Sequence, residues 1–260
     1  MPGQYVFPGG TVESLDKETE IWKAHADMGC DAFSLRLGGD MAVEEALAFS
    51  VAAIRETFEE AGVLLAGGNE RFHAEREKIW HRRMTEGLPK VWLRELVNCE
   101  GRVLAFSGLA RWSHWITPQR MPQRFDTRFF IAFMPPGQEC VPDQRETTKG
   151  IWINPREALV GNSRGEIPLG PPTLVTLHEL LQYSKLEALE KDTETRTWGE
   201  PLLPRLVPLS PGFLILEPWD PMIDRDVLPD PQELEEAILP VGEPFSRIWN
   251  HDGLWRPVRI

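Results

Sequence analysis

The stretch Arg55-Glu56-Thr57-Phe58-Glu59-Glu60-Ala61-Gly62-Val63 predicts both a helix end and a cluster of acidic side chains. We expect it to close a helix that begins near Asp40, a residue type favoured at helix N-caps, and ends at Gly62, the residue type most favoured just past a helix end. Apolar residues at alternating steps of four and three predict one buried stripe along this helix. The stripe comprises Leu47, Val51, Ile54, Phe58 and Ala61.

The opposite face of this predicted helix is acidic. Glu56, Glu59 and Glu60 stand at positions i, i+3 and i+4, so we expect their carboxylates to converge on a patch about one helical turn long. Like charges that close repel one another unless a cation sits among them, and dense oxygen ligands suit Mg²⁺ or Mn²⁺. The alternative is a solvated helix face that binds nothing.

The pattern Arg-Glu-x-x-Glu-Glu-x-Gly-Val from Arg55 resembles the second half of the Nudix box, the signature of hydrolases that cleave a nucleoside diphosphate linked to another moiety. Phe7-Pro8-Gly9-Gly10 resembles the lead-in to that box, and Asp16 stands where the family has a glutamate. The family has seven residues between that glutamate and the arginine, whereas Lys17 to Ile54 spans 38 residues. A split box is typical of the CoA-diphosphatase-like branch, typified by a peroxisomal mammalian enzyme.

A second stretch carries the same resemblance. Trp115-Ile116-Thr117-Pro118 and Arg124 to Phe130 are similar to the Trp-x-Thr-Pro and Arg-Phe-Asp-Thr-x-Phe-Phe segments of that branch. Arginine's planar fork suits bidentate contacts to phosphate and to carboxylate alike. We therefore predict that Arg124 and Arg128 bind substrate phosphate, with salt bridges to Asp126 or to the box glutamates as an equal alternative.

The resemblance implies an α/β (α+β) Nudix fold, in which a mixed β-sheet lies between helices. Residues 1–185 would form the Nudix domain, with helical insertions at about 17–40 and 70–98, and residues 186–260 a C-terminal extension packed on it. The family has a further strand and an arginine-bearing loop before the Pro8 turn, where this sequence has seven residues. We expect either a gene start placed too late or a lost element.

Other segments have local signals of their own. We expect strands at 5–7, 103–109, 150–153, 202–209 and 213–216, and helices at 17–31, 70–97 with a break at 87–89, 156–160 and from 171 onward.

The resemblance also assigns roles to site residues. Glu56, Glu59 and Glu60 would hold Mg²⁺ or Mn²⁺, with Glu56 and Glu59 also serving catalysis. Arg55 would hold a neighbouring carboxylate in place. Gly9 and Gly10 would shape the loop that meets the substrate. Glu146 is the candidate for a further carboxylate that acts as metal ligand or general base, against the alternative of a surface charge.

The implied activity is metal-dependent hydrolysis of CoA or acyl-CoA at its diphosphate, which gives phosphopantetheine and adenosine 3′,5′-bisphosphate. Another nucleoside diphosphate, such as a dinucleotide or nucleotide sugar, is the alternative substrate. A non-catalytic domain that binds nucleotide-like ligands is the alternative function. The complete set of Glu56, Glu59 and Glu60 favours a hydrolase, because non-catalytic members commonly have a degraded set.

Composition limits the partners. The net charge of −12 argues against a nucleic-acid surface, whose usual mark is a basic patch. The sequence has neither a signal peptide nor an apolar run near the roughly 20 residues of a membrane span, so a cytoplasmic protein without a membrane partner is expected. Three widely spaced cysteines favour reduced thiols. The oligomeric state is left open.

Overall fold

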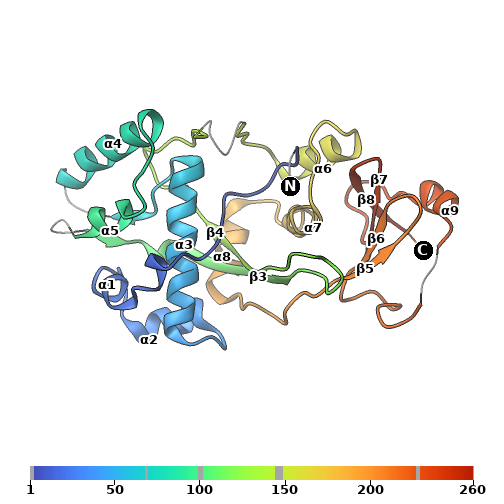
Figure 1. Cartoon of the computed structure of the whole chain (residues 1–260), viewed down its shortest axis with the longest axis horizontal. Helices are drawn as coiled ribbons and strands as arrows, with labels where there is room; N and C mark the ends of the chain where they lie inside the picture. The colour runs from blue at the N-terminus through green and yellow to red at the C-terminus, as the bar shows by residue number, and fades with distance from the viewer. Residues whose placement is uncertain (1–2, 68–69, 99–101, 144–148, 227–228, 260) are drawn as a thin grey trace.

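A computed structural model describes residues 3–67, 70–98, 102–143, 149–226 and 229–259. Figure 1 shows an elongated molecule with the helices α1 to α5 at one end, a four-stranded sheet at the other, and the long hairpin β3–β4 between them. The helices are α1 Thr19–Ala24, α2 Cys30–Phe33, α3 Val43–Ala61, α4 Glu70–Thr85, α5 Trp92–Val97, α6 Pro155–Ser163, α7 Pro171–Leu180, α8 Leu186–Thr195 and α9 Pro231–Glu236. The strands are β1 Ala66–Gly67, β2 Val103–Leu104, β3 Leu109–Ile116, β4 Asp126–Ala132, β5 Arg205–Pro208, β6 Phe213–Leu216, β7 Arg247–His251 and β8 Leu254–Val258.

Helix α3 is the element around which the N-terminal half packs. Its predicted stripe is buried and joins an apolar cluster that includes Trp92 of α5 and Phe106. The helix ends at Gly62, whose φ of 73° in the left-handed region favours glycine, as predicted. Its start is later than predicted, with Ala42 at the N-cap, because Gly39 turns the chain at φ 62° and leaves Asp40 in that turn.

The strands form three antiparallel sheets with the orders β1-β2, β3-β4 and β5-β6-β7-β8. Among the described residues, parallel pairing takes the form of isolated bridges, namely Tyr5↔Leu169, Ala26↔Leu104 and Trp115↔Leu202. The mixture of helices and strands agrees with the predicted fold class. The pairing differs from one continuous mixed sheet, because its parallel parts are single bridges between segments.

Several local predictions need correction. The strand expected at 5–7 is reduced to the bridge at Tyr5, and the one expected at 150–153 is absent from the described part of that segment, where Trp152 is 75% exposed. The helix expected at 17–31 is interrupted, because His25 and Asp27 form backbone hydrogen bonds with Leu104 instead. The strand expected at 103–109 is broken by a 3₁₀ turn at Phe106–Gly108.

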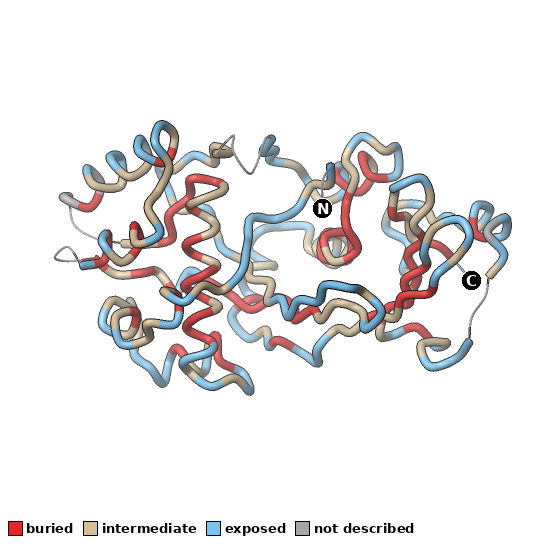
Figure 2. Tube along the Cα trace, viewed as in Figure 1, coloured by how far each residue is buried: buried red, intermediate tan, exposed pale blue. Residues whose placement is uncertain are grey.

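The C-terminal part shares a core with the middle of the chain. Leu206, Ile215, Ile248 and Trp255 of the four-stranded sheet pack in one apolar cluster with residues of α6 and α7. Figure 2 shows the buried residues of this end as one group and those along α3 as another. The boundary at residues 185 and 186 stays a prediction. No helix in the described ranges is long and apolar enough to cross a membrane.

Candidate active site

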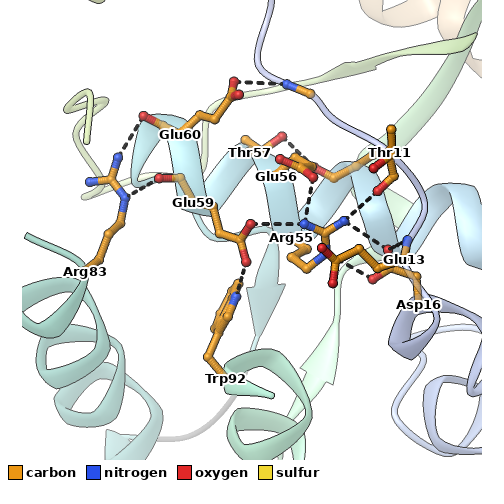
Figure 3. Close-up of polar contacts among 12 residues, drawn as sticks. Thr11, Glu13, Asp16, Arg55, Glu56, Thr57, Glu59, Glu60, Arg83 and Trp92 are labelled. Carbon is orange, nitrogen blue, oxygen red and sulfur yellow. Dashed lines mark hydrogen bonds and ion pairs between the residues drawn. The ribbon is translucent and has the colours of Figure 1, made fainter. Parts of the chain in front are cut away.

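Arg55, near the C-terminal end of α3, is the centre of a charged network (Figure 3). Its Nε and Nη2 donate to the two carboxylate oxygens of Asp16, each at 3.0 Å. Nη1 donates to Glu56 Oε1 at 2.7 Å and to Glu59 Oε2 at 3.0 Å, while Nη2 also donates to the Thr11 carbonyl at 2.9 Å. One guanidinium therefore fixes three carboxylates and the loop that precedes Asp16.

The pair of Arg55 and Asp16 joins the two halves of the split motif. Asp16 is 1% exposed, and its Oδ2 also accepts from the Glu13 amide at 2.8 Å. Burial disfavours the charged guanidinium, but the hydrogen bonds and charges of Asp16 and Glu56 outweigh burial and hold the pKa of Arg55 above its ordinary value. The expectation that Arg55 holds a neighbouring carboxylate agrees with this geometry.

Gly10 passes directly over the carboxylate of Glu56. A Cβ atom at Gly10 would overlap that carboxylate, so this position has no room for a side chain. The Glu56 side chain is 13% exposed, and burial raises the pKa of this carboxyl, although the charge and hydrogen bond of Arg55 oppose the rise. The glycine turn thus closes one side of the acidic helix end.

Two of the three box glutamates meet, whereas the third points away, which corrects the expectation that all three converge. Glu56 and Glu59 both accept from Arg55 Nη1. Glu59 Oε1 accepts from the Trp92 indole, and Glu60 Oε2 accepts from the Gly9 amide at 3.1 Å. Within the described ranges, no three His, Cys, Asp or Glu side chains form a group that could hold a metal ion. Glu60 points away from the other two because its donor is the Gly9 amide, whereas Glu56 and Glu59 share Arg55 as a donor.

Arg83 of α4 holds the carbonyl end of α3. Its Nε donates to the Glu59 carbonyl at 2.8 Å, and its Nη2 donates to the Glu60 and Val141 carbonyls at 2.7 and 2.8 Å. A cation at this position also complements the negative end of the helix dipole. Burial lowers the pKa of Arg83 from its ordinary value, yet an arginine there remains charged.

A cavity of about 600 Å³ opens beside this helix end. That volume falls within the range of pockets for small molecules, roughly 300–1,000 Å³. Its walls come from the end of α3, from residues 82–90 at the end of α4 and in the turn that leads to α5, and from two loop residues. The lining residues are Glu13, Arg55, Glu59, Glu60, Arg82, Arg83, Glu86, Gly87, Leu88, Pro89, Lys90 and Asp143.

Comparison with known proteins identifies the family. Residues 1–180 match the NUDT19 Nudix domain family over more than half of the chain. This chain belongs to that Nudix family. The acyl-coenzyme A diphosphatase NUDT19 of Gallus gallus is 30% identical over 300 residues, which cover 95% of this chain and 78% of the relative. Its namesake from Homo sapiens is 28% identical, with coverage of 95% and 76%.

A solved structure supports the fold. The crystal structure of a NUDIX hydrolase from Alicyclobacillus acidocaldarius superposes with a TM-score of 0.55 and 24% identity, and covers 76% of this chain and 84% of that one. The chain is therefore a Nudix hydrolase with the Nudix fold.

Nudix hydrolases generally need a divalent metal, and the donor set of this cavity fits one. Glu59 and Glu60 line the cavity, and Glu13 and Asp143 add further carboxylates to its walls. Hard oxygen donors of this kind suit Mg²⁺ or Mn²⁺. The assignment of Glu56, Glu59 and Glu60 as ligands stays a prediction.

The structure does not bring every predicted residue of the Nudix site together. Arg124 donates to the Thr117 carbonyl at 3.1 Å and does not line the cavity. Arg128 lies over the rings of Phe49 and Trp198 and forms an ion pair with Asp126 at 3.6 Å. This placement matches the salt-bridge alternative for Arg128, and substrate binding by either arginine stays a prediction. Glu146 lies outside the described residues.

Sequence reasoning missed Trp92, Lys90 and Asp143 as site residues. The basic pair Arg82-Arg83 was the nearest signal, but a solvated helical hairpin is the commoner explanation of such charges. Asp143 stands in the acidic loop from which Glu146 was chosen. Its amide donates to the Glu60 carbonyl at 3.2 Å, which places this loop beside the box helix.

Proposed function

We propose that this chain hydrolyses the diphosphate of CoA or acyl-CoA. Water attacks one phosphorus, the bridging P–O bond breaks, and the products are phosphopantetheine, with any acyl group retained, and adenosine 3′,5′-bisphosphate. The observation that carries the proposal is the link from Arg55 to Asp16, which rebuilds the split box of this branch beside a cavity lined by Glu59 and Glu60. The relatives are named as acyl-coenzyme A diphosphatases, which suggests the substrate.

Glu59 is the residue best placed to accept the proton of the attacking water. Both of its carboxylate oxygens accept hydrogen bonds, from Arg55 and from Trp92, so the group is held in one orientation. Its side chain is 30% exposed and lines the cavity, so water and substrate can reach it. A positioned carboxylate base contributes roughly 10²- to 10⁴-fold in rate.

Mg²⁺ or Mn²⁺ is the cofactor that we assign to Glu59 and Glu60, with Glu56 as the third carboxylate. When bound, such an ion neutralises the diphosphate and lowers the pKa of the attacking water. Arg55 and Gly10 contribute by fixing where Glu56 stands, because the guanidinium donates to it and the glycine leaves room for it. The cytoplasmic location expected from the sequence remains a prediction.

The test is a hydrolysis panel of acyl-CoA, free CoA, NADH, ADP-ribose and a nucleotide sugar, each with Mg²⁺, with Mn²⁺ and with chelator. We expect metal-dependent release of adenosine 3′,5′-bisphosphate from the CoA compounds. Cleavage confined to NADH, ADP-ribose or the nucleotide sugar would contradict the substrate and keep the reaction. A folded protein that binds a panel member without cleaving any would contradict the reaction itself.

A further inference from the structure

The segment from Arg82 to Lys90 presents two cations to the cavity. Among the described residues, neither side chain links this segment to another part of the fold. Lys90 is exposed and has no hydrogen bond or ion pair with any residue that the structure describes. Arg82 is about half exposed, and its Nε forms an ion pair with Glu86 Oε2 at 3.7 Å. Arg55 and Arg83, the other two arginines of the cavity, are buried and donate to fixed carboxylates and carbonyls.

Contacts to α3 set the position of this segment at both ends. Arg83, next to Arg82, donates to the Glu59 and Glu60 carbonyls. Trp92, two residues after Lys90, donates to the Glu59 carboxylate, and its ring centroid lies 4.8 Å from that of Phe58. The two cations are therefore held at a defined place relative to the predicted catalytic glutamate.

Short-range hydrogen bonds also shape the chain between these anchors. The amides of Glu86 and Gly87 both donate to the Arg82 carbonyl at 2.9 Å, and Gly87 adopts a φ of 89°, where glycine is favoured. The Trp92 amide donates to the Pro89 carbonyl at 2.9 Å. The turn thus has an ordered backbone that positions Lys90 at the cavity wall.

We infer that Lys90 and Arg82 form a subsite for a phosphomonoester carried by the substrate beside its diphosphate. In CoA this group is the 3′-phosphate of the ribose, so the inference rests on the proposed function. The carboxylates at the end of α3, with the metal that they would hold, serve the diphosphate. Lys90 and Arg82, whose ion pair with Glu86 is long at 3.7 Å, leave positive charge on a separate wall for a second phosphate. Lysine and arginine bind phosphate by charge-assisted hydrogen bonds.

The experiment compares CoA with 3′-dephospho-CoA, which share the diphosphate and differ in the 3′-phosphate. Loss of one charge-assisted contact costs roughly ten- to a hundredfold, so Lys90→Ala and Arg82→Ala should lower kcat/KM for CoA by that factor. Both variants should leave kcat/KM for 3′-dephospho-CoA within about threefold of wild type. Lys78→Ala is the matched control, since Lys78 also lies on α4 but is 71% exposed and pairs with Glu75 outside the cavity.

A binding measurement separates failure of this inference from failure of the proposed function. Calorimetry with adenosine 3′,5′-bisphosphate and with AMP should show a preference for the bisphosphate that Lys90→Ala removes and Lys78→Ala keeps. Equal losses on both substrates would place the cations on the diphosphate and overturn the subsite, as would unchanged kinetics in both variants. A wild-type protein that prefers the bisphosphate but cleaves no CoA would contradict the proposed reaction and leave the subsite standing.

Discussion

Two regions of the molecule bury carboxyl groups, and they treat them in opposite ways. At the end of α3, Asp16 and Glu56 are hydrogen bonded to Arg55, and the adjacent Glu59 faces a cavity. In the C-terminal sheet, Glu217 is 0% exposed, and neither of its carboxylate oxygens has a hydrogen-bond partner among the described residues. Nearby, Arg247 Nε donates to Asp220 Oδ2 at 2.7 Å and not to Glu217.

The difference shows what distinguishes a site from a buried charge. A carboxylate that accepts hydrogen bonds on one side and meets a cavity on the other is held ready for a ligand. Burial raises the pKa of Glu217 to about 8, so this group stays protonated over most of the physiological range and offers no charge to a ligand. A shifted pKa by itself therefore does not mark the active site in this chain.

The largest loss of activity is expected on substitution of Glu59, which faces the cavity. Glu59→Gln removes the negative charge but keeps the shape, so turnover should fall by roughly 10²- to 10⁴-fold while the fold survives. Steady-state hydrolysis of the cleaved panel substrate, with circular dichroism as the control for folding, measures both. Turnover within threefold of wild type would show that the cavity end of α3 is not the catalytic centre.

Gly10 should come next in size. In Gly10→Ala the new Cβ displaces the Glu56 carboxylate, and misplacement of about 1 Å at a catalytic site can cost about 10²-fold in rate. Gly9→Ala is the matched comparison, because a Cβ there has open space around it and the amide that donates to Glu60 is kept. We expect at least tenfold more activity in Gly9→Ala than in Gly10→Ala, and equal activities would contradict the role of close packing.

Glu217 tests the other region through stability. Its pKa is higher in the folded chain than the ordinary value of 4.5, so the folded state binds the extra proton and the free energy of unfolding falls as the pH rises from about 4.5 to about 8. Glu217→Gln removes this dependence. The variant should match wild type near pH 4.5 and exceed it by a margin that grows up to about pH 8, by roughly 1 kcal/mol for each pH unit, because only the wild-type acid must ionise or bind a proton.

Urea titrations of Glu217→Gln and wild type at pH 5, 7 and 8.5 measure this difference. Kinetic constants should be the same in both proteins, because Glu217 directly follows β6 and does not line the cavity. A gap that narrows as the pH rises would contradict the assignment of Glu217 as a protonated, unpartnered acid.

Arg124 should show the smallest effect. The side chain is exposed, donates to the Thr117 carbonyl and does not line the cavity, so Arg124→Ala should change KM by less than about twofold and destabilise the fold by less than about 1 kcal/mol. A KM raised tenfold or more would restore the sequence-based assignment of this arginine to the substrate and would place its loop nearer to the site than the structure does.

Prediction from the sequence succeeded where the cause is local or lies in motif order. The apolar stripe of α3 and its end at Gly62 follow from residue spacing and from the φ that glycine tolerates. The meeting of Asp16 with Arg55 follows from the order of the split motif, although 38 residues separate the two halves.

Other features depend on contacts between distant segments and leave no local trace. Trp92 and Arg83 reach α3 through the packing of α5 and α4, and nothing in their own neighbourhood indicates a partner. The glutamates were expected to converge from helical spacing alone, but only Glu56 and Glu59 meet, at Arg55, and the Gly9 amide holds the Glu60 carboxylate away from them. For Arg128 the sequence left two alternatives open, because an arginine suits phosphate and carboxylate alike, and the structure shows the ion pair with Asp126.

We propose that the cavity at the end of α3 holds the metal at which the diphosphate is cut. The most direct measurement is a crystal structure with Mn²⁺ and adenosine 3′,5′-bisphosphate, in which anomalous scattering locates the metal. We predict an anomalous peak within bonding distance of Glu59 and Glu60, with the Glu60 carboxylate turned away from Gly9 and the nucleotide beside Lys90. A metal or nucleotide bound elsewhere, with the cavity free of both, would contradict the account.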